Sequence, residues 1–169
     1  MQSDMKWTSN TGQIVLKAYK KLWMIRRLKG MGANEEELID IYIKQVRSVL
    51  ELAVPAWHGA ITQVERNEIE RVQKAAHHII LGDKYLSYRS ALRHTGLQTL
   101  ESRRDKLCLK FARKAEKHPK HKQWFKLSKK AANTRQKQPK YCTVLANKGR
   151  YRRSPISYLT SLLNKDKQK

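Results

Sequence analysis

The chain has 169 residues, 40% of them hydrophobic, which is enough for one domain with a modest core. Lys and Arg number 37 against 14 Asp and Glu, giving a formal net charge of +23 at pH 7. An excess of this size favours a polyanionic partner, with nucleic acid ahead of an anionic membrane surface.

The sequence lacks the features of secreted and membrane proteins. Its first residues, MQSDMKWTSN, have no apolar signal-peptide core, and no apolar stretch approaches the length that spans a bilayer. Cys108 and Cys142 are too few for a disulfide framework or a thiol-rich zinc site. We therefore expect an intracellular, reduced protein with no membrane partner, and leave open whether it is nuclear or cytoplasmic.

The charge is concentrated in the second part of the chain. Residues 1–101 hold 15 basic and 11 acidic residues, a net of +4, whereas residues 102–169 hold 22 basic and 3 acidic residues, a net of +19. The first part is typical of an ordinary folded domain. The second is typical of a segment that lies along phosphates.

Helical spacing dominates, and no run shows the clean alternation of a strand. The first predicted helix starts and stops with Gly12 and Gly30. Its predicted apolar face holds Ile14, Ala18, Leu22 and Ile25, widened by Val15, Tyr19 and Trp23. Most of the remaining arc is basic, with Lys17, Lys20, Lys21 and Arg27.

The second predicted helix starts at a capping box of Asn34 and Glu37. Pro55 should end it at or just before Val54. Its stripe comprises Leu38, Ile41, Tyr42, Gln45, Val46, Val49, Leu50 and Ala53. We expect the stretch around Pro55 to be a hinge between helices, with Trp57 buried in the corner. His58 has no relay or ligand partner at suitable spacing in its own stretch, so the sequence gives little support for catalysis there.

Three more helices are predicted before residue 119. One starts at Thr62 with Glu65 completing a capping box and ends at Gly82, and a short one covers 87–95 before Gly96. The third runs from about 99 to 118, ahead of Pro119. Its predicted apolar face is Leu100, Leu107, Cys108, Phe111 and Ala115, and its other faces carry Arg103, Arg104, Lys106, Lys110, Arg113 and Lys114.

After Pro119 the helical pattern is lost, and 126–153 reads as an extended basic segment with few apolar anchors. Ser154 and Pro155 then predict the N-cap and first residue of a short last helix with Ile156, Leu159, Leu162 and Leu163 on its apolar face. We predict an all-α fold: a small helical bundle followed by a basic, largely extended tail with one short helix.

No catalytic or metal-binding pattern stands out. His77 and His78 are adjacent and diverge on a helix, and no third ligand accompanies His118 and His121. Cys108 falls on an apolar helix face, which favours a core residue over a nucleophile. The aspartates are scattered, so no carboxylate pair is available to hold divalent cations for phosphoryl transfer. We expect neither enzymatic activity nor a cofactor or metal.

Nucleic-acid binding is the remaining strong signal. Aromatic residues that can stack on bases interleave with the charge, namely Trp124, Phe125, Tyr141, Tyr151 and Tyr158. Two alternatives stay open. The basic faces could simply be solvated, and Trp124 and Phe125 could anchor the tail on the core.

The chain resembles the C-terminal region of reverse transcriptases from non-LTR, LINE-type, jockey-like retrotransposons. The similar stretches cover nearly the whole chain and include RSVLELAVPAWH, IERVQKAAHHII and LQTLESRRDKLCLKFA, in that order, then QPKY and SPISYLTSLLN. In that family a polymerase palm with a Tyr-x-Asp-Asp motif precedes this region, and the motif is absent here.

The resemblance implies a thumb-like subdomain that holds a template–primer duplex without doing chemistry. It implies a remnant of the palm-proximal segment at 1–12, a helical thumb-like domain at 13–118, a basic linker at 119–153 and a C-terminal helix and end at 154–169. The chain would then be a truncated element copy. The expected partners are RNA, DNA or both, and a polymerase palm if one is supplied elsewhere. The alternative is a helical protein-interaction remnant without independent function.

The candidate nucleic-acid-binding residues follow from this charge placement. They are Lys17, Lys20, Lys21 and Arg27 in the first helix; Arg103, Arg104, Lys106, Lys110, Arg113 and Lys114 in the fifth; and Lys129, Lys130, Arg135, Lys137, Lys140, Arg150, Arg152 and Arg153 in the tail.

Overall fold

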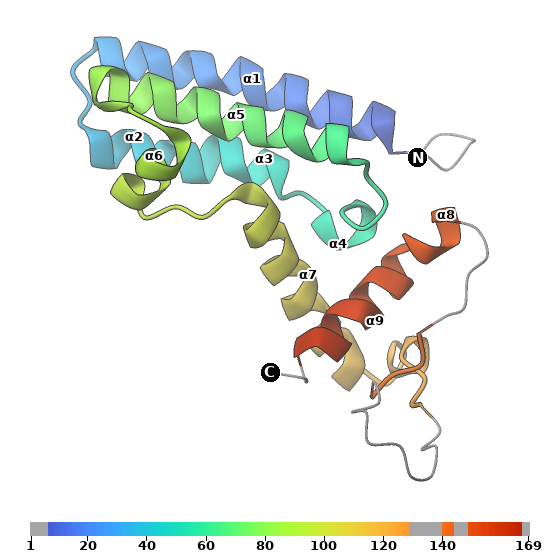
Figure 1. Ribbon diagram of the computed structural model, residues 1–169. Coiled ribbons are helices and arrows are strands. Elements are labelled where there is room, and N and C mark those ends of the chain that lie inside the picture. The colour runs from blue at the N-terminus through green and yellow to red at the C-terminus, as the bar shows by residue number, and fades with distance from the viewer. Residues whose placement is uncertain (1–6, 129–139, 144–148, 167–169) are drawn as a thin grey trace. The chain divides into compact units, whose positions relative to one another are not determined.

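A computed structural model describes residues 7–128, 140–143 and 149–166, and these residues are mostly helical, which confirms the all-α class (Figure 1). No β-strand occurs among them, and one isolated antiparallel bridge joins Leu127 to Tyr141. The helices are α1 Thr8–Gly30, α2 Glu35–Ile41, η1 Tyr42–Arg47, α3 Ser48–Leu50, α4 Val54–Trp57, α5 Gln63–Leu81, η2 Gly82–Lys84, α6 Tyr88–Thr95, α7 Leu100–Lys117, η3 Lys122–Trp124, α8 Gly149–Arg152 and α9 Pro155–Asp166.

The chain divides into two compact units. The first comprises Met1–Ala53 and Ile61–Arg103, and the second comprises Val54–Ala60 and Arg104–Lys169. Helix α7 gives its first turn to the first unit and the rest of its length to the second. The segment boundaries predicted from the sequence stay predictions.

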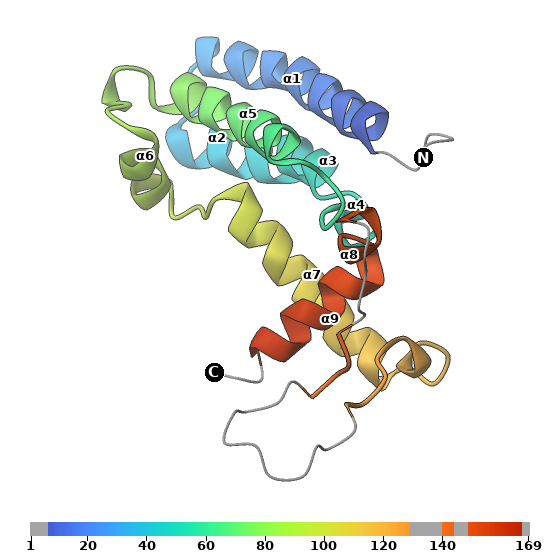
Figure 2. The same ribbon diagram turned by 45° about the vertical axis from the view of Figure 1, so that its right-hand side comes forward.

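In the first unit, α1, α5 and the rod formed by α2, η1 and α3 lie side by side (Figures 1 and 2). The buried side chains of α1 include Ile14, Ala18, Leu22 and Ile25, as the spacing predicts. The helix begins at Thr8 and not at Gly12, which lies inside it. The Thr11 hydroxyl donates to the Trp7 carbonyl at 3.1 Å, so the extra turn has a local hydrogen bond in addition to the backbone bonds.

The predicted widening of the α1 apolar face is wrong. The side chain of Trp23 is 65% exposed and that of Tyr19 is 40% exposed, while Val15 is partly exposed. The four buried positions already fill the arc that faces α5 and the α2–α3 rod. The aromatic residues further round the helix therefore remain in solvent.

The second helix begins at the predicted capping box, in which Asn34 and Glu37 each accept a backbone N–H of the other residue. Its middle, η1, is a π-helix, and the buried residues Leu38, Tyr42, Val46 and Leu50 recur every four positions. A wider helical turn keeps this four-residue repeat on one face, where a regular α-helix would let it drift.

The helix ends at Leu50, earlier than predicted, and Pro55 lies inside the short helix α4. A proline provides no N–H for the carbonyl four residues earlier and crowds it, and here that carbonyl belongs to Glu51. The chain therefore breaks between Leu50 and Val54, where Ala53 has a left-handed φ of 51°. Ala53 is exposed and not buried as predicted, whereas Trp57 is buried as predicted.

The predicted starts of α5, α6 and α9 are confirmed. Thr62 and Glu65 form a complete capping box, the Ser87 hydroxyl accepts the Ser90 N–H, and Pro155 is the first residue of α9. Helix α6 ends at the predicted Gly96, which is left-handed.

A buried polar network ties α5 and α6 to η1 and the start of α7. The Tyr42 hydroxyl donates to Gln73 at 2.8 Å, and the Gln73 amide donates to the Tyr88 hydroxyl at 2.9 Å and to the Gln98 carbonyl at 2.8 Å. Tyr88 donates in turn to Glu70, which also accepts the Leu100 N–H. Because desolvation is costly for unpaired polar groups, this network favours one mutual arrangement of the four segments.

The second unit contains α4, α7, α8 and α9. Phe125 and Tyr141 are buried, and Asn164 of α9 both accepts the Tyr141 N–H and donates to its carbonyl, each at 3.0 Å. Two further backbone bonds join Ser128 to Lys140 and Cys142 to Lys126. The basic segment, for which the sequence predicts an extended chain, therefore has anchors at 125–128 and 140–142. Of the predicted α9 face, Leu159 and Leu163 are buried but Ile156 is exposed.

Candidate nucleic-acid interface

One face of α7 carries a continuous row of cations. Five basic side chains and Leu109 line a shallow hollow of about 400 Å³. The cations are Lys106, Lys110, Arg113, Lys114 and Lys117. We call these five residues the α7 strip. From its first to its last residue the strip rises by about 16 Å, at 1.5 Å per residue, so it could contact several successive phosphates.

Arg113 is the one member of the α7 strip for which the described residues supply an acidic partner. Its guanidinium donates to both carboxylate oxygens of Asp166 in α9, with the shortest distance 2.7 Å. No carboxylate among the described residues pairs with the four lysines of the strip, and all four are exposed. The strip therefore presents four cations to solvent and a fifth that is partly neutralised.

The two arginines at the start of α7 do not join the strip. Arg103 donates to Glu51 at 3.0 Å within the first unit. Arg104 is fully buried, and its Nε donates to Nδ1 of His58 at 3.2 Å. Helical spacing predicts a polar-face position for Arg104, but the structure buries this residue and leaves Phe111 40% exposed. A buried guanidinium cannot reach a phosphate at the surface, so we leave Arg104 out of the interface.

The cations of α1 stand on the face away from its buried residues. Lys17, Lys20 and Arg27 are exposed, and Lys21 is half-buried and donates to Gln45 at 3.3 Å. Helix α1 carries six Lys and Arg and no carboxylate. No carboxylate of the described residues pairs with Lys17, Lys20 or Arg27, so their charge is available to an anion.

Only some of the candidate binding residues in the tail lie among the residues that the structure describes. Lys129, Lys130, Arg135 and Lys137 lie outside the described residues, as does the side chain of Arg150. Lys140 pairs with Glu116 at 3.2 Å and lies over the ring of Tyr141. Arg152 and Arg153 are exposed beside the start of α9.

Most of the aromatic residues predicted to stack on bases already make contacts within the protein. Phe125 and Tyr141 are buried against each other, and the Tyr158 hydroxyl donates to Asp105. Trp124 is half-buried and packs on His121, and Tyr151 is exposed. The most exposed aromatic side chain, Trp23, was assigned to the core by the helical wheel. The wheel cannot locate the edge of a buried arc, so the sequence gives no signal for this exposure.

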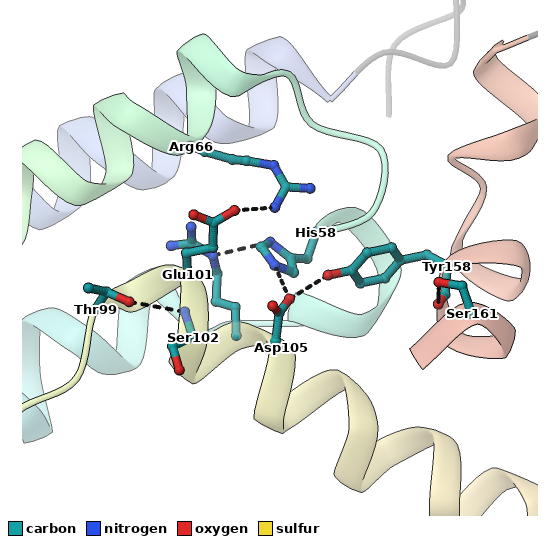
Figure 3. A network of polar contacts seen from close by, with 9 residues as sticks. His58, Arg66, Thr99, Glu101, Ser102, Asp105, Tyr158 and Ser161 are labelled. Carbon is teal, nitrogen blue, oxygen red and sulfur yellow. Dashed lines mark hydrogen bonds and ion pairs between the residues drawn. The ribbon is translucent and has the colours of Figure 1, made fainter. Parts of the chain in front are cut away.

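The second unit also holds a polar network around His58, which Figure 3 shows from close by. His58 is fully buried; its Nδ1 faces Arg104, and its Nε2 lies 2.9 Å from Oδ1 of Asp105. A guanidinium Nε only donates, so Nδ1 of His58 accepts, and the ring proton is on Nε2 and points at Asp105. Tyr158 of α9 donates to the same Asp105 oxygen.

This network ties α7 and α9 of the second unit to the segment that follows α4. Both ring nitrogens of His58 are engaged, one with Arg104 and one with Asp105. Sequence reasoning missed the network because Arg104 and Asp105 lie 46 and 47 residues from His58. No local spacing reports such a pairing.

The described residues contain no group of three or more His, Cys, Asp or Glu placed to hold a metal ion. Cys108 is buried in the apolar core of its unit, as its helical position predicts. None of the helices formed by these residues is long and apolar enough to cross a membrane.

Comparisons with protein-family models, with curated proteins and with solved structures find no match to this chain.

Proposed function

We propose that the chain is a non-catalytic nucleic-acid-binding fragment of a non-LTR retrotransposon reverse transcriptase, which holds template–primer or element RNA through basic helix faces. The observation that carries the proposal is the α7 strip. Four exposed lysines follow one helix face without a carboxylate partner among the described residues. Such a row neutralises backbone phosphates without reading sequence.

The acid-free helix α1 supports the proposal independently. Six cations on one helix with no Asp or Glu repel each other, and a bound polyanion relieves that repulsion. The family resemblance adds the assignment of the helical bundle as thumb-like and of 119–153 as a basic extension of the binding surface. Partners would be RNA or DNA, together with a palm domain where one is present.

A salt titration tests the proposal. Fluorescence anisotropy of a labelled duplex and a labelled single strand, measured between about 50 and 200 mM salt, should give a steep linear fall of log K with log salt. The triple variant Lys106→Gln, Lys110→Gln, Lys114→Gln removes three members of the strip. It should reduce the magnitude of the slope by about 2 to 3, since each phosphate contact contributes roughly 0.7 to 0.9.

A matched control changes the net charge equally at other exposed lysines. Lys44, Lys74 and Lys84 lie on η1, α5 and η2 of the first unit, and their triple change to Gln should leave the slope nearly as in the parent protein. Equal losses in both triple variants would show that only total charge matters. An unchanged slope in the α7 variant would rule out the strip as the binding site.

A further inference from the structure

The solvent face of α1 combines two exposed aromatic rings with cations, whereas α7 exposes one ring, that of Phe111. Leu16, Tyr19 and Trp23 are 57%, 40% and 65% exposed, and their spacing of three and four residues puts them next to one another along the helix. A tryptophan is usually largely buried, so this exposure needs a reason.

Cations lie on both sides of the most exposed ring. Lys20 precedes Trp23 by three residues and Arg27 follows it by four, so both neighbour it on the helix surface, and both are exposed. A face for an ordinary protein partner would mix charges of both signs, but α1 offers only positive ones. The face is therefore complementary to a ligand that is anionic and has flat apolar surfaces.

We propose that the α1 face binds unpaired nucleotides, with bases stacked on Trp23 and Tyr19 and phosphates held by Lys20 and Arg27. This inference rests on the proposed function and adds to it a preference for single strands at this face. The two rings are four residues apart, which is about 6 Å along the helix. Bases in a duplex rise by only about 3.4 Å, so two neighbouring bases can reach both rings only when they are unstacked.

The test compares ring variants on an oligouridylate, an oligothymidylate and a duplex. Trp23→Leu keeps an apolar side chain but removes the ring, and should weaken binding of both single strands roughly 5-fold to 150-fold, the range of one base–aromatic stack. Trp23→Phe should lose less. Binding of the duplex should not change. A loss on only one of the two single strands would assign the face to RNA or to DNA.

Two controls distinguish base stacking at the α1 face from non-specific apolar binding and from the proposed function. Leu16→Ala removes apolar area from the same face without removing a ring, and should leave single-strand affinity unchanged. If Trp23→Leu binds single strands like the parent protein while the α7 triple variant is impaired, the α1 inference is wrong and the proposed function stands. If the parent protein binds none of the three probes at low salt, the proposed function itself fails.

The competing occupant is another protein surface, including a second copy of the chain. Light scattering, which measures the oligomeric state, tests whether a second copy of the chain covers this face. A parent protein that self-associates, and a Trp23→Leu variant that is monomeric with unchanged nucleic-acid binding, would overturn the proposal.

Discussion

Replacing Gly59 by alanine should loosen α9 from α4. A Cβ at Gly59 would lie 2.6 Å from both Cβ and Cγ of Tyr158 and 3.1 Å from its Cδ1, whereas carbon atoms in contact prefer about 3.5–4.0 Å. The Cβ of Tyr158 is fixed to the backbone of α9, so a rotation of its side chain cannot remove the overlap. The two helices must move apart instead.

The expected cost follows from two effects. Overpacking of a buried site costs about 1–3 kcal/mol. A shift of α9 also stretches the hydrogen bond from Tyr158 to Asp105, which is worth about 1 kcal/mol. We therefore expect Gly59→Ala to lower the free energy of unfolding of the second unit by about 2–4 kcal/mol, summing these two ranges.

Hydrogen exchange read by mass spectrometry is the suitable assay, because it reports α9 separately from the first unit. Amides of α9 should exchange faster in the variant, and those of α1 and α5 should not change. Gly12→Ala is the matched control, since nothing lies within 4 Å of a Cβ there and alanine favours the interior of a helix. Unchanged exchange in α9 of Gly59→Ala would refute the packing argument.

Three further predictions concern buried and titrating groups. His58→Phe removes the Nδ1 acceptor of the Nε of the buried Arg104 and should lower the free energy of unfolding by about 1–3 kcal/mol in urea denaturation, the cost of leaving a buried donor unsatisfied. The ring of His77 faces Thr95, Tyr42 and Tyr88. Burial lowers the pKa of this imidazole below its ordinary 6.5, and the charge of His78 lowers that pKa by a smaller amount. The unfolded chain then binds the proton first, so stability should fall as pH drops below about 6.5, and His77→Gln should flatten that part of the pH profile. Hydrogen bonds from Lys84 and His94 hold the pKa of Glu35 below its ordinary 4.5, so Lys84→Ala should raise that pKa in an NMR titration.

The elements that the sequence predicted well are those fixed by local chemistry. A capping box needs only Thr62 and Glu65, three residues apart, and Gly96 ends α6 because it adopts a left-handed backbone readily. These signals do not depend on the rest of the fold. The all-α class and most helix bounds could be predicted for that reason.

The faces of the helices were predicted less well, because packing partners decide them. In α7 the set Arg104, Cys108, Ala112 and Ala115 is buried. The predicted set replaced Arg104 and Ala112 by Leu107 and Phe111. Both sets have helical spacing, and apolarity favours the predicted one. Arg104 belongs to the buried set because Nδ1 of His58, 46 residues earlier in the chain, accepts a hydrogen bond from it.

Arginines are usually exposed and tryptophans usually buried, but Arg104 is buried and Trp23 is exposed. We interpret the first exception as structural and the second as functional. Arg104 is a buried cation with a hydrogen-bond acceptor inside the protein, Nδ1 of His58. Trp23 is an aromatic side chain that is 65% exposed, so little of its unit packs on it. We therefore expect Trp23→Leu to leave the urea midpoint of the protein unchanged while it weakens single-strand binding. Arg104→Met should do the reverse. A Trp23→Leu variant that lost stability would place the ring in the folded core and remove the α1 face as a binding surface.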